Sequence, residues 1–233
     1  MHIIKTTLIL MMMTIIISAA DPTNFGDFIG QNGKTAAYSN QNDAHISRKP
    51  HFITVNGETL CSGMKWQCVE YARRWLIENQ GIFFDDVEYA TNIWSLTHGI
   101  HLSNQKQKLA VEQFPNGSAL KKPDVGDLLI YNTAYAPITG HVSVIVEVGD
   151  TTIKIAEQNY SNDKWAAPHY SQELDIVAEK KNENSAISYR INNEGIIGWV
   201  RFLKPSTHIL NKEIAPVKTV ANDLVVSDEP NEK

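Results

Sequence analysis

The sequence predicts an α+β fold, with helices in its first half and an antiparallel sheet in its second. Apolar residues recur at helical spacing between residues 67 and 80, at Val69, Ala72, Leu76 and Ile77. From Asp124 onward, short apolar runs separated by turn residues predict β-strands instead. Helices followed by a run of strands, rather than an alternation of the two, are typical of α+β proteins.

The predicted elements follow in chain order. The helix at 67–80 ends at Gly81, because a glycine can take the left-handed conformation that terminates helices. A second helical stretch is expected over 86–95, with apolar positions at Val87, Ala90, Ile93 and Trp94. The predicted strands are 127–131, 141–148, 152–159 and 198–202, and residues 173–190 are expected to add another.

Residues 1–20 have the features of a secretory signal peptide. Lys5 supplies a positive charge, residues 8–17 form an apolar run too short to span a membrane, and Ser18-Ala19-Ala20 offers small residues for cleavage. We therefore expect cleavage after Ala20 and an exported protein, periplasmic or secreted. The alternative is an uncleaved N-terminal anchor. No cysteine follows the apolar run, so no stable membrane anchor is expected after signal cleavage.

Removing 20 of the 233 residues leaves 213, enough for one domain with a hydrophobic core. Residues 21–49 are rich in Asn, Gly, Ser and Asp, which predicts an irregular N-terminal arm. The domain is expected to span 50–203. Residues 204–233 are polar and contain prolines, which predicts a flexible tail.

The charge of the chain excludes one class of partner. The formal net charge is −5, and it becomes −6 when Lys5 leaves with the signal. No basic stripe is present, which argues against nucleic acid or an anionic membrane surface. A metal site is not expected either, because His98 and His101 have no acidic or thiol ligands nearby in the sequence.

Cys68 is the candidate nucleophile because it stands at the start of the predicted helix. The partial positive charge and unpaired N–H groups of a helix N-terminus favour a thiolate. The same N–H groups can receive the oxyanion that forms when a thiolate attacks an acyl carbon. A cysteine at a helix start is often only a packed small residue, so the interpretation requires partners.

His141 and Glu157 are the expected partners of Cys68. Side chains alternate between the faces of a strand, so Val142, Val144, Val146 and Val148 are expected on one face and His141 on the other. A turn of about three residues between 148 and 152 places His141 opposite Asn159 and diagonal to Glu157. A carboxylate and an amide then lie within reach of the imidazole. We favour Glu157 as the group that orients it.

Four segments of the sequence resemble a known family, and they occur in its order. They are Trp66-Gln67-Cys68-Val69-Glu70-Tyr71-Ala72-Arg73-Arg74-Trp75, Val125-Gly126-Asp127-Leu128-Leu129-Ile130-Tyr131, Gly140-His141-Val142 and Ala156-Glu157-Gln158-Asn159. Together they resemble the CHAP amidohydrolase domain, and within it the amidase domain of glutathionylspermidine and trypanothione synthetase/amidases. The resemblance covers about residues 50–203.

The resemblance implies a fold, a mechanism and a set of site residues. The fold is a papain-like α+β domain, with the cysteine helix packed against an antiparallel sheet. Cys68 would be the nucleophile, His141 the general base and then acid, and Glu157 the partner of the histidine. Arg73 and Asn159 would hold the glutathione part of a substrate. No metal or organic cofactor is implied.

The sequence leaves three hypotheses about function open. The first is an amidase that releases a polyamine from a thiol conjugate of the glutathione type. The second is a peptidoglycan amidase or endopeptidase with the same triad, which the export signal favours. The third is a non-catalytic binding domain in which Cys61 and Cys68 form a disulfide. The bifunctional relatives continue into a synthetase domain, and the tail here is too short for one, so no ligase activity is expected.

Overall fold

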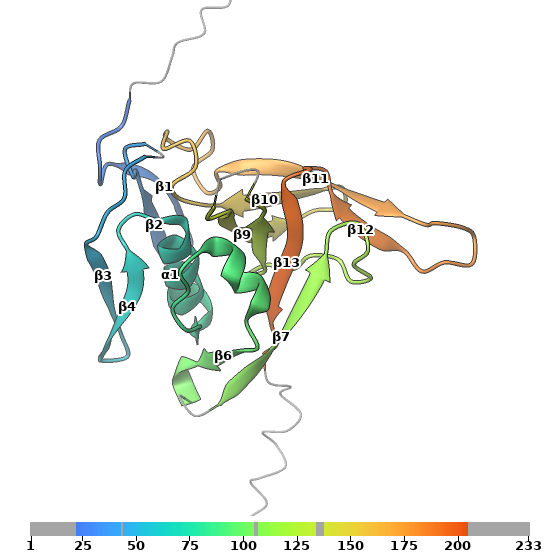
Figure 1. The fold of residues 1–233 in the computed structure, drawn as a ribbon, viewed down its shortest axis with the longest axis horizontal. Helices are drawn as coiled ribbons and strands as arrows, with labels where there is room; N and C mark the ends of the chain where they lie inside the picture. The colour runs from blue at the N-terminus through green and yellow to red at the C-terminus, as the bar shows by residue number, and fades with distance from the viewer. Residues whose placement is uncertain (1–21, 43, 105–106, 134–137, 205–233) are drawn as a thin grey trace, which may run out of the picture. The chain divides into compact units, whose positions relative to one another are not determined.

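The computed structural model describes residues 22–42, 44–104, 107–133 and 138–204 (Figure 1). The predicted signal peptide at 1–20 and nearly all of the predicted tail at 204–233 lie outside these ranges. Within the described ranges, no helix is long and apolar enough to cross a membrane.

The largest element is a nine-stranded sheet in which every pair of neighbours runs antiparallel. Its spatial order is β12-β11-β10-β9-β8-β13-β7-β6-β5. The strands are β5 (Ile82–Phe83), β6 (His98–His101), β7 (Lys108–Pro115), β8 (Leu128–Tyr131), β9 (His141–Val148), β10 (Thr152–Ala156), β11 (Gln172–Glu179), β12 (Ser188–Ile191) and β13 (Ile196–Phe202).

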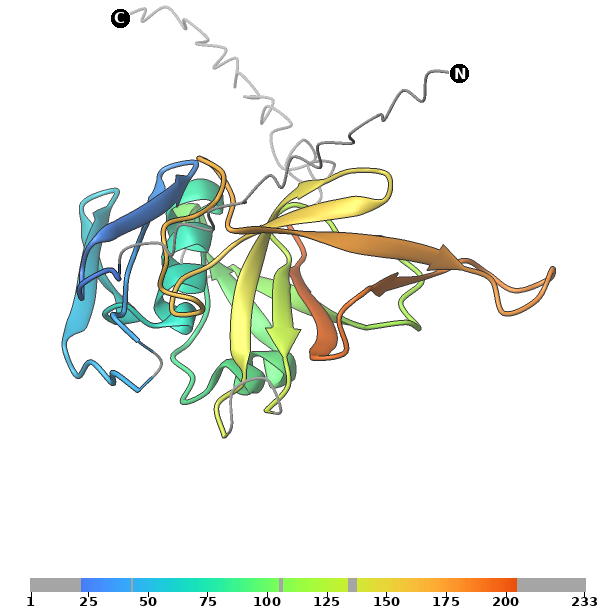
Figure 2. The same ribbon diagram turned by 90° about the horizontal axis from the view of Figure 1, so that it is seen from above.

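Helix α1 (Cys68–Gln80) forms where the helical spacing predicts it. Gly81 ends it in the left-handed conformation, with φ of +66°, and its N–H donates to the carbonyl of Ile77 at 3.1 Å. The helix packs against β9 on one side and against β4 (Glu58–Met64) on another (Figures 1 and 2). With one long helix on an antiparallel sheet, the α+β prediction is confirmed.

Two hydrophobic clusters pack on the two faces of the sheet. Tyr71 and Leu76 of α1 join Val142 and Val144 of β9 in the first cluster. The second cluster lies on the opposite face and contains Leu129, Ile145, Ile153, Ile155 and Trp199. Alternate residues of β9 therefore face different clusters, as a period of two requires.

The face predicted for Val148 is wrong, and the cause is a β-bulge. Val148 pairs with Ile153, whereas Ile145 pairs with Ile155, so β9 contains one extra residue between these pairs. The bulge turns Val148 to the same face as Ile145, where it packs against the second cluster. Val142, Val144 and Val146 remain on the helix side, as predicted.

The N-terminal arm is more regular than predicted. Residues 21–49 contain a hairpin of β1 (Phe28–Asn32) and β2 (Thr35–Tyr38), and β3 (Pro50–Val55) pairs with β4 in a second hairpin. The sequence pattern hides the first hairpin because Gly30 interrupts it. The ring of Trp165 lies on that glycine, where an added Cβ would come within 2.1 Å of a ring carbon.

The second helical stretch is a short 3-10 helix, η1 (Ala90–Ser95), rather than an α-helix over 86–95. The side chain of Asn92 accepts a hydrogen bond from the N–H of Tyr89 at 2.9 Å, which sets the start of the turn. The N–H of Leu96 donates to the carbonyl of Ile93, and this hydrogen bond ends η1 after two turns. A further 3-10 turn, η2 (Leu102–Asn104), follows β6.

Candidate active site

Cys68 is the first residue of α1, and its thiol is half-buried. Gln67, which precedes it, has an extended backbone and no side-chain cap on the helix. The sulfur accepts hydrogen bonds from the backbone N–H groups of Val69 and Val142 and from the side chain of His141. The structure thus brings the start of α1 and the start of β9 to one point.

The thiol and the imidazole favour each other's charged forms. Burial raises the pKa of Cys68, but the hydrogen bond from His141 and the charge of His141 outweigh it and lower the pKa overall. Burial lowers the pKa of His141, but hydrogen bonds to Cys68 and Glu157 outweigh that effect and raise it. The pair is therefore poised as thiolate and imidazolium.

Glu157 completes the arrangement on the other side of the imidazole. Its Oε2 lies 2.7 Å from His141 Nε2, and the side chains of His141 and Glu157 are 4% and 3% exposed. Because Nε2 is engaged by the carboxylate, the other ring nitrogen, Nδ1, is left to face the sulfur. Thiol, imidazole and carboxylate thus form a chain from the helix across two strands.

The register of β9 and β10 places Glu157 as the sequence predicts. Near the site, Ile155 pairs with Ile145 and Ala156 pairs with Val144. Continuing that register by one residue sets Glu157 opposite Ser143, which is diagonal to His141. At the turn, the observed register differs from the predicted one by one residue. The bulge brings the two registers back into agreement near the site.

The side-chain hydrogen bonds of Asn159 go to Asn40 and Gln67. It lies just beyond β10 with a φ of +58°, and its Nδ2 donates to Gln67 Oε1 at 3.0 Å. Its Oδ1 accepts from Asn40 Nδ2 at 2.9 Å, and Asn40 Oδ1 accepts from Gln67 Nε2 at 3.1 Å. The three amides close a ring that holds Gln67, the residue before Cys68. A contact of Asn159 with substrate stays a prediction.

The structure does not bring Arg73 to the thiol. Its side chain is buried, with Nη1 bonded to Asp86 Oδ1 at 2.9 Å and the guanidinium 4.9 Å from the centre of the Phe83 ring. Burial lowers the pKa of Arg73, and the charge of Asp86 partly offsets this. The predicted role of Arg73 in substrate binding stays a prediction.

A buried cluster of charges and amides supports the first turns of α1. Glu70 is fully buried and accepts hydrogen bonds from Arg74 Nε at 2.7 Å and from Gln158 Nε2 at 3.0 Å. His51 Nδ1 and Ser62 Oγ each lie 2.8 Å from Glu70 Oε1. Sequence reasoning missed this cluster, although the Glu70–Arg74 spacing is that of a helical ion pair.

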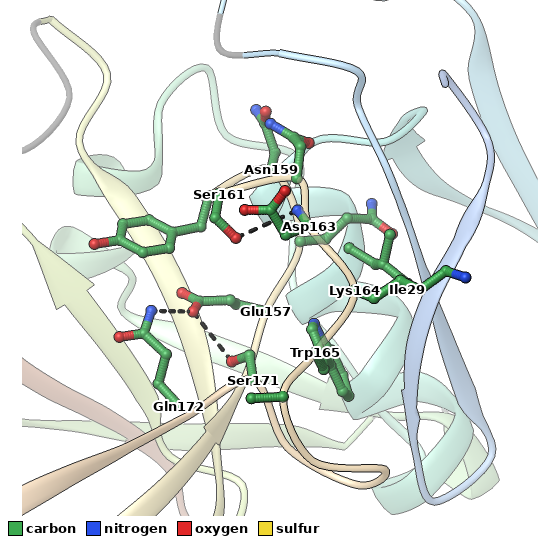
Figure 3. Close-up of a pocket in the computed structure, with 13 residues that line it drawn as sticks. Ile29, Glu157, Asn159, Ser161, Asp163, Lys164, Trp165, Ser171 and Gln172 are labelled. Carbon is green, nitrogen blue, oxygen red and sulfur yellow. Dashed lines mark hydrogen bonds between the residues drawn. The ribbon is translucent and has the colours of Figure 1, made fainter. Parts of the chain in front are cut away.

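A cavity of about 320 Å³ opens beside Glu157 (Figure 3). Ile29 and Trp165 line one side of it, and in this view Ser171 approaches the carboxylate of Glu157 from below and the amide of Gln172 approaches it from the left. Residues 158–164 and Ala166 form the rest of its lining. No sequence signal indicates this cavity, because its loop follows no repeating pattern.

The structure bears on the disulfide alternative that the sequence leaves open. Cys61 and Cys68 are not bonded to each other, and Cys61 is exposed on β4. In the part of the chain that the structure describes, no three His, Cys, Asp or Glu side chains group as metal ligands.

Comparison with known proteins assigns the domain. Residues 60–159 match the family model described as CHAP domain. The chain carries a CHAP domain. The match contains the start of α1, His141 and Glu157, so all three members of the candidate triad lie inside the CHAP domain. The resemblance predicted from the four segments is confirmed.

The curated relatives extend well beyond this chain. Trypanothione synthetase of Crithidia fasciculata is 33% identical over 240 residues, which cover 90% of this chain and 34% of the relative. Bifunctional glutathionylspermidine synthetase/amidase of Escherichia coli (strain K12) is 36% identical over 140 residues, which cover 59% and 22%. The chain spans about a third of the first relative and less of the second. The CHAP domain and this similarity together support an amidase of the CHAP type.

Proposed function

We propose that this protein is an exported cysteine amidohydrolase that cleaves the amide of a thiol–polyamine conjugate such as glutathionylspermidine. The observation that carries the chemistry is the chain of contacts from Cys68 through His141 to Glu157. The name of the Escherichia coli relative, which includes an amidase, supports the substrate class. The pattern of residues 1–20 supports export.

The first half of the proposed reaction forms a thioester. The Cys68 thiolate attacks the amide carbonyl carbon, and the oxyanion is received by N–H groups at the start of α1. The carbon–nitrogen bond then breaks, and His141 gives its proton to the leaving amine. Glu157 keeps the imidazole oriented and stabilises its positive charge.

The second half releases the acid. His141, now neutral, takes a proton from a water molecule, which attacks the thioester carbon. The carbon–sulfur bond breaks, the carboxylic acid leaves, and the thiolate and imidazolium are restored. In this scheme the imidazole of His141 carries every proton that is transferred.

The test is amine release by the purified protein lacking residues 1–20. Glutathionylspermidine is the first substrate, and peptidoglycan fragments are the second. We expect release of spermidine that is lost in Cys68→Ala and retained in the matched control Cys61→Ser. Cleavage of peptidoglycan fragments alone would contradict the polyamine assignment and leave the triad standing. Release that persists in Cys68→Ala would contradict the triad.

A further inference from the structure

The second oxygen of Glu157 has its own set of donors. While Oε2 faces His141, Oε1 lies 2.6 Å from Gln172 Nε2 and 3.1 Å from Ser171 Oγ (Figure 3). Gln172 begins β11 and pairs with Ile155 of β10, two residues before Glu157. The sheet register therefore carries its side chain diagonally to the carboxylate.

The two donors are not equivalent. Ser171 Oγ is also 2.9 Å from the carbonyl oxygen of Ile155, and a hydroxyl has one hydrogen to donate. When the hydroxyl of Ser171 donates its hydrogen to the carbonyl of Ile155, it does not donate to the carboxylate of Glu157. Gln172 Nε2 carries two N–H groups and can keep one on Oε1 throughout. The amide of Gln172 is thus the more persistent of the two donors.

A carboxylate in this position requires such a donor. Glu157 is 3% exposed, so water does not replace a missing partner easily. A buried charge that loses a hydrogen-bond partner is strongly destabilised. A carboxylate held by His141 alone is also free to rotate about its last bond. Either change weakens the contact that stabilises the imidazolium.

We propose that Gln172, assisted by Ser171, is a positioning residue that holds the carboxylate of Glu157 so that its Oε2 stays on His141. Through His141, this contact supports the thiolate of Cys68. The proposal rests on the proposed triad. Both residues lie outside the matched range 60–159, so a strand beyond the family match completes the active site.

The other ionisable groups around Glu157 do not replace this contact. Burial raises the pKa of the Tyr71 phenol on α1 and of the Tyr131 phenol on β8, and the negative charge of Glu157 raises both further. Both phenols therefore stay neutral. The Tyr160 ring lies 5.5 Å from that of His141. Asp163 and Lys164 of the loop line the same cavity, and each is exposed.

The experiment follows the alkylation rate of Cys68 by iodoacetamide as a function of pH, in a Cys61→Ser background with one remaining thiol. Gln172→Met keeps the shape of the side chain and removes the donor, whereas Gln172→Glu also adds a like charge. Glu173→Met is the matched control, because residue 173 is exposed and adjacent on the same strand. Thermal unfolding of each variant checks folding.

We expect the acid limb of the profile to move to higher pH in both Gln172 variants, and further in Gln172→Glu. On this limb the rate should fall by about threefold or more, because a rise of about 0.5 in the pKa of the thiol has that effect. The control should follow the parent. An unchanged limb, or one that moves to lower pH, in either folded variant would overturn the proposal. Alkylation requires no substrate, so failure of the proposed amide hydrolysis is distinguished from failure of this contact.

Discussion

At the scale of single residues, the reactivity of Cys68 depends on its neighbours more than on its exposure. Burial alone disfavours the thiolate, and the hydrogen bond and charge of His141 reverse that effect. His141 is in turn stabilised as a cation by Cys68 and Glu157. The two groups titrate as a pair, so the thiolate–imidazolium form is lost when either one changes its charge.

The pH dependence of this pair follows from the directions in which the two pKa values move. The pKa of Cys68 is lowered, so the thiolate persists to lower pH than that of an ordinary thiol and is lost only below that pKa. The pKa of His141 is raised, so the imidazolium is lost only as the pH rises above that pKa. The reactive form therefore occupies a broad window between the two values.

His141→Ala should remove the lowering of the Cys68 pKa and leave the effect of burial. We expect the acid limb of Cys68 alkylation to move to higher pH, and the rate on that limb to fall about tenfold for each unit by which the pKa of the thiol rises. The measurement uses the Cys61→Ser background, with His98→Ala as a control, because His98 lies on β6, away from β9 in the sheet. Equal rates in the parent and His141→Ala on that limb would contradict the pairing.

Sequence reasoning identified the three residues of the candidate triad but not those that hold them. Cys68, His141 and Glu157 each carry a local signal, either a helix start or a place on a strand. Gln172 and Asn40 carry none, because their roles depend on which side chains the fold brings beside them. Amide side chains are common on surfaces, and their spacing in the sequence does not reveal such contacts.

At the scale of elements, helix α1 is fixed by a buried charge in its first turn. Glu70 joins the helix to Ser62 of β4, to His51 of β3 and to Gln158 after β10. Burial raises the pKa of Glu70, but hydrogen bonds from His51 and Arg74 outweigh it and lower the pKa to about 2. The cluster thus ties helix α1 to both the β3–β4 hairpin and the sheet.

Glu70→Gln should destabilise the protein, because it leaves the buried guanidinium of Arg74 without its counter-charge. We expect the free energy of unfolding at pH 7 to fall by about 3 kcal/mol, as for other buried pairs that lose one partner. Urea denaturation measures it. Glu112→Gln, which breaks the surface pair with Lys121, should cost less than about 1 kcal/mol.

The loss should also depend on pH in a defined direction. Because the pKa of Glu70 is lowered on folding from 4.5 to about 2, its contribution is complete above pH 4.5 and is lost as the pH falls toward 2. The difference in stability between parent and Glu70→Gln should therefore shrink over that interval. A difference that stays constant between pH 7 and pH 2 would contradict the role of the carboxylate.

Element types were largely predictable, whereas their local irregularities were not. The spacing of Val69, Ala72 and Leu76 located α1, and apolar runs located β8, β9, β10 and β13. The bulge in β9 and the 3-10 form of η1 depend on contacts with neighbouring strands and on one capping side chain. Neither leaves a periodic signal in the sequence.

At the scale of the whole molecule, the candidate active site is assembled from segments on both sides of the family match. The β1–β2 hairpin buries Ile29 and Ala37 in the same cluster as α1, and Asn40 accepts a hydrogen bond from Gln67, the residue before Cys68. Gln172, on β11, follows the matched range in the sequence and donates a hydrogen bond to Glu157. The strand order, with β13 between β8 and β7, joins distant parts of the chain. Sequence patterns do not predict such non-local pairing.

Removal of residues 21–49 should therefore damage the site and not only shorten the chain. We expect a protein that starts at residue 50 to melt at a lower temperature than one that starts at residue 21, because apolar surface of α1 is uncovered. Alkylation of Cys68 at neutral pH should slow as well, since the amide ring around Gln67 is broken. A truncated protein with unchanged melting temperature and alkylation rate would refute this view of the arm.

The most direct test of the proposed mechanism is the detection of an acyl group on Cys68 during turnover. Protein lacking residues 1–20 is mixed with glutathionylspermidine, quenched in acid within milliseconds, and its intact mass and Cys68 peptide are measured. We expect a mass increase equal to the glutathionyl acyl group, located on Cys68 and absent in Cys68→Ala. Release of spermidine with an unmodified Cys68 peptide, or an acyl group on another residue, would contradict the mechanism.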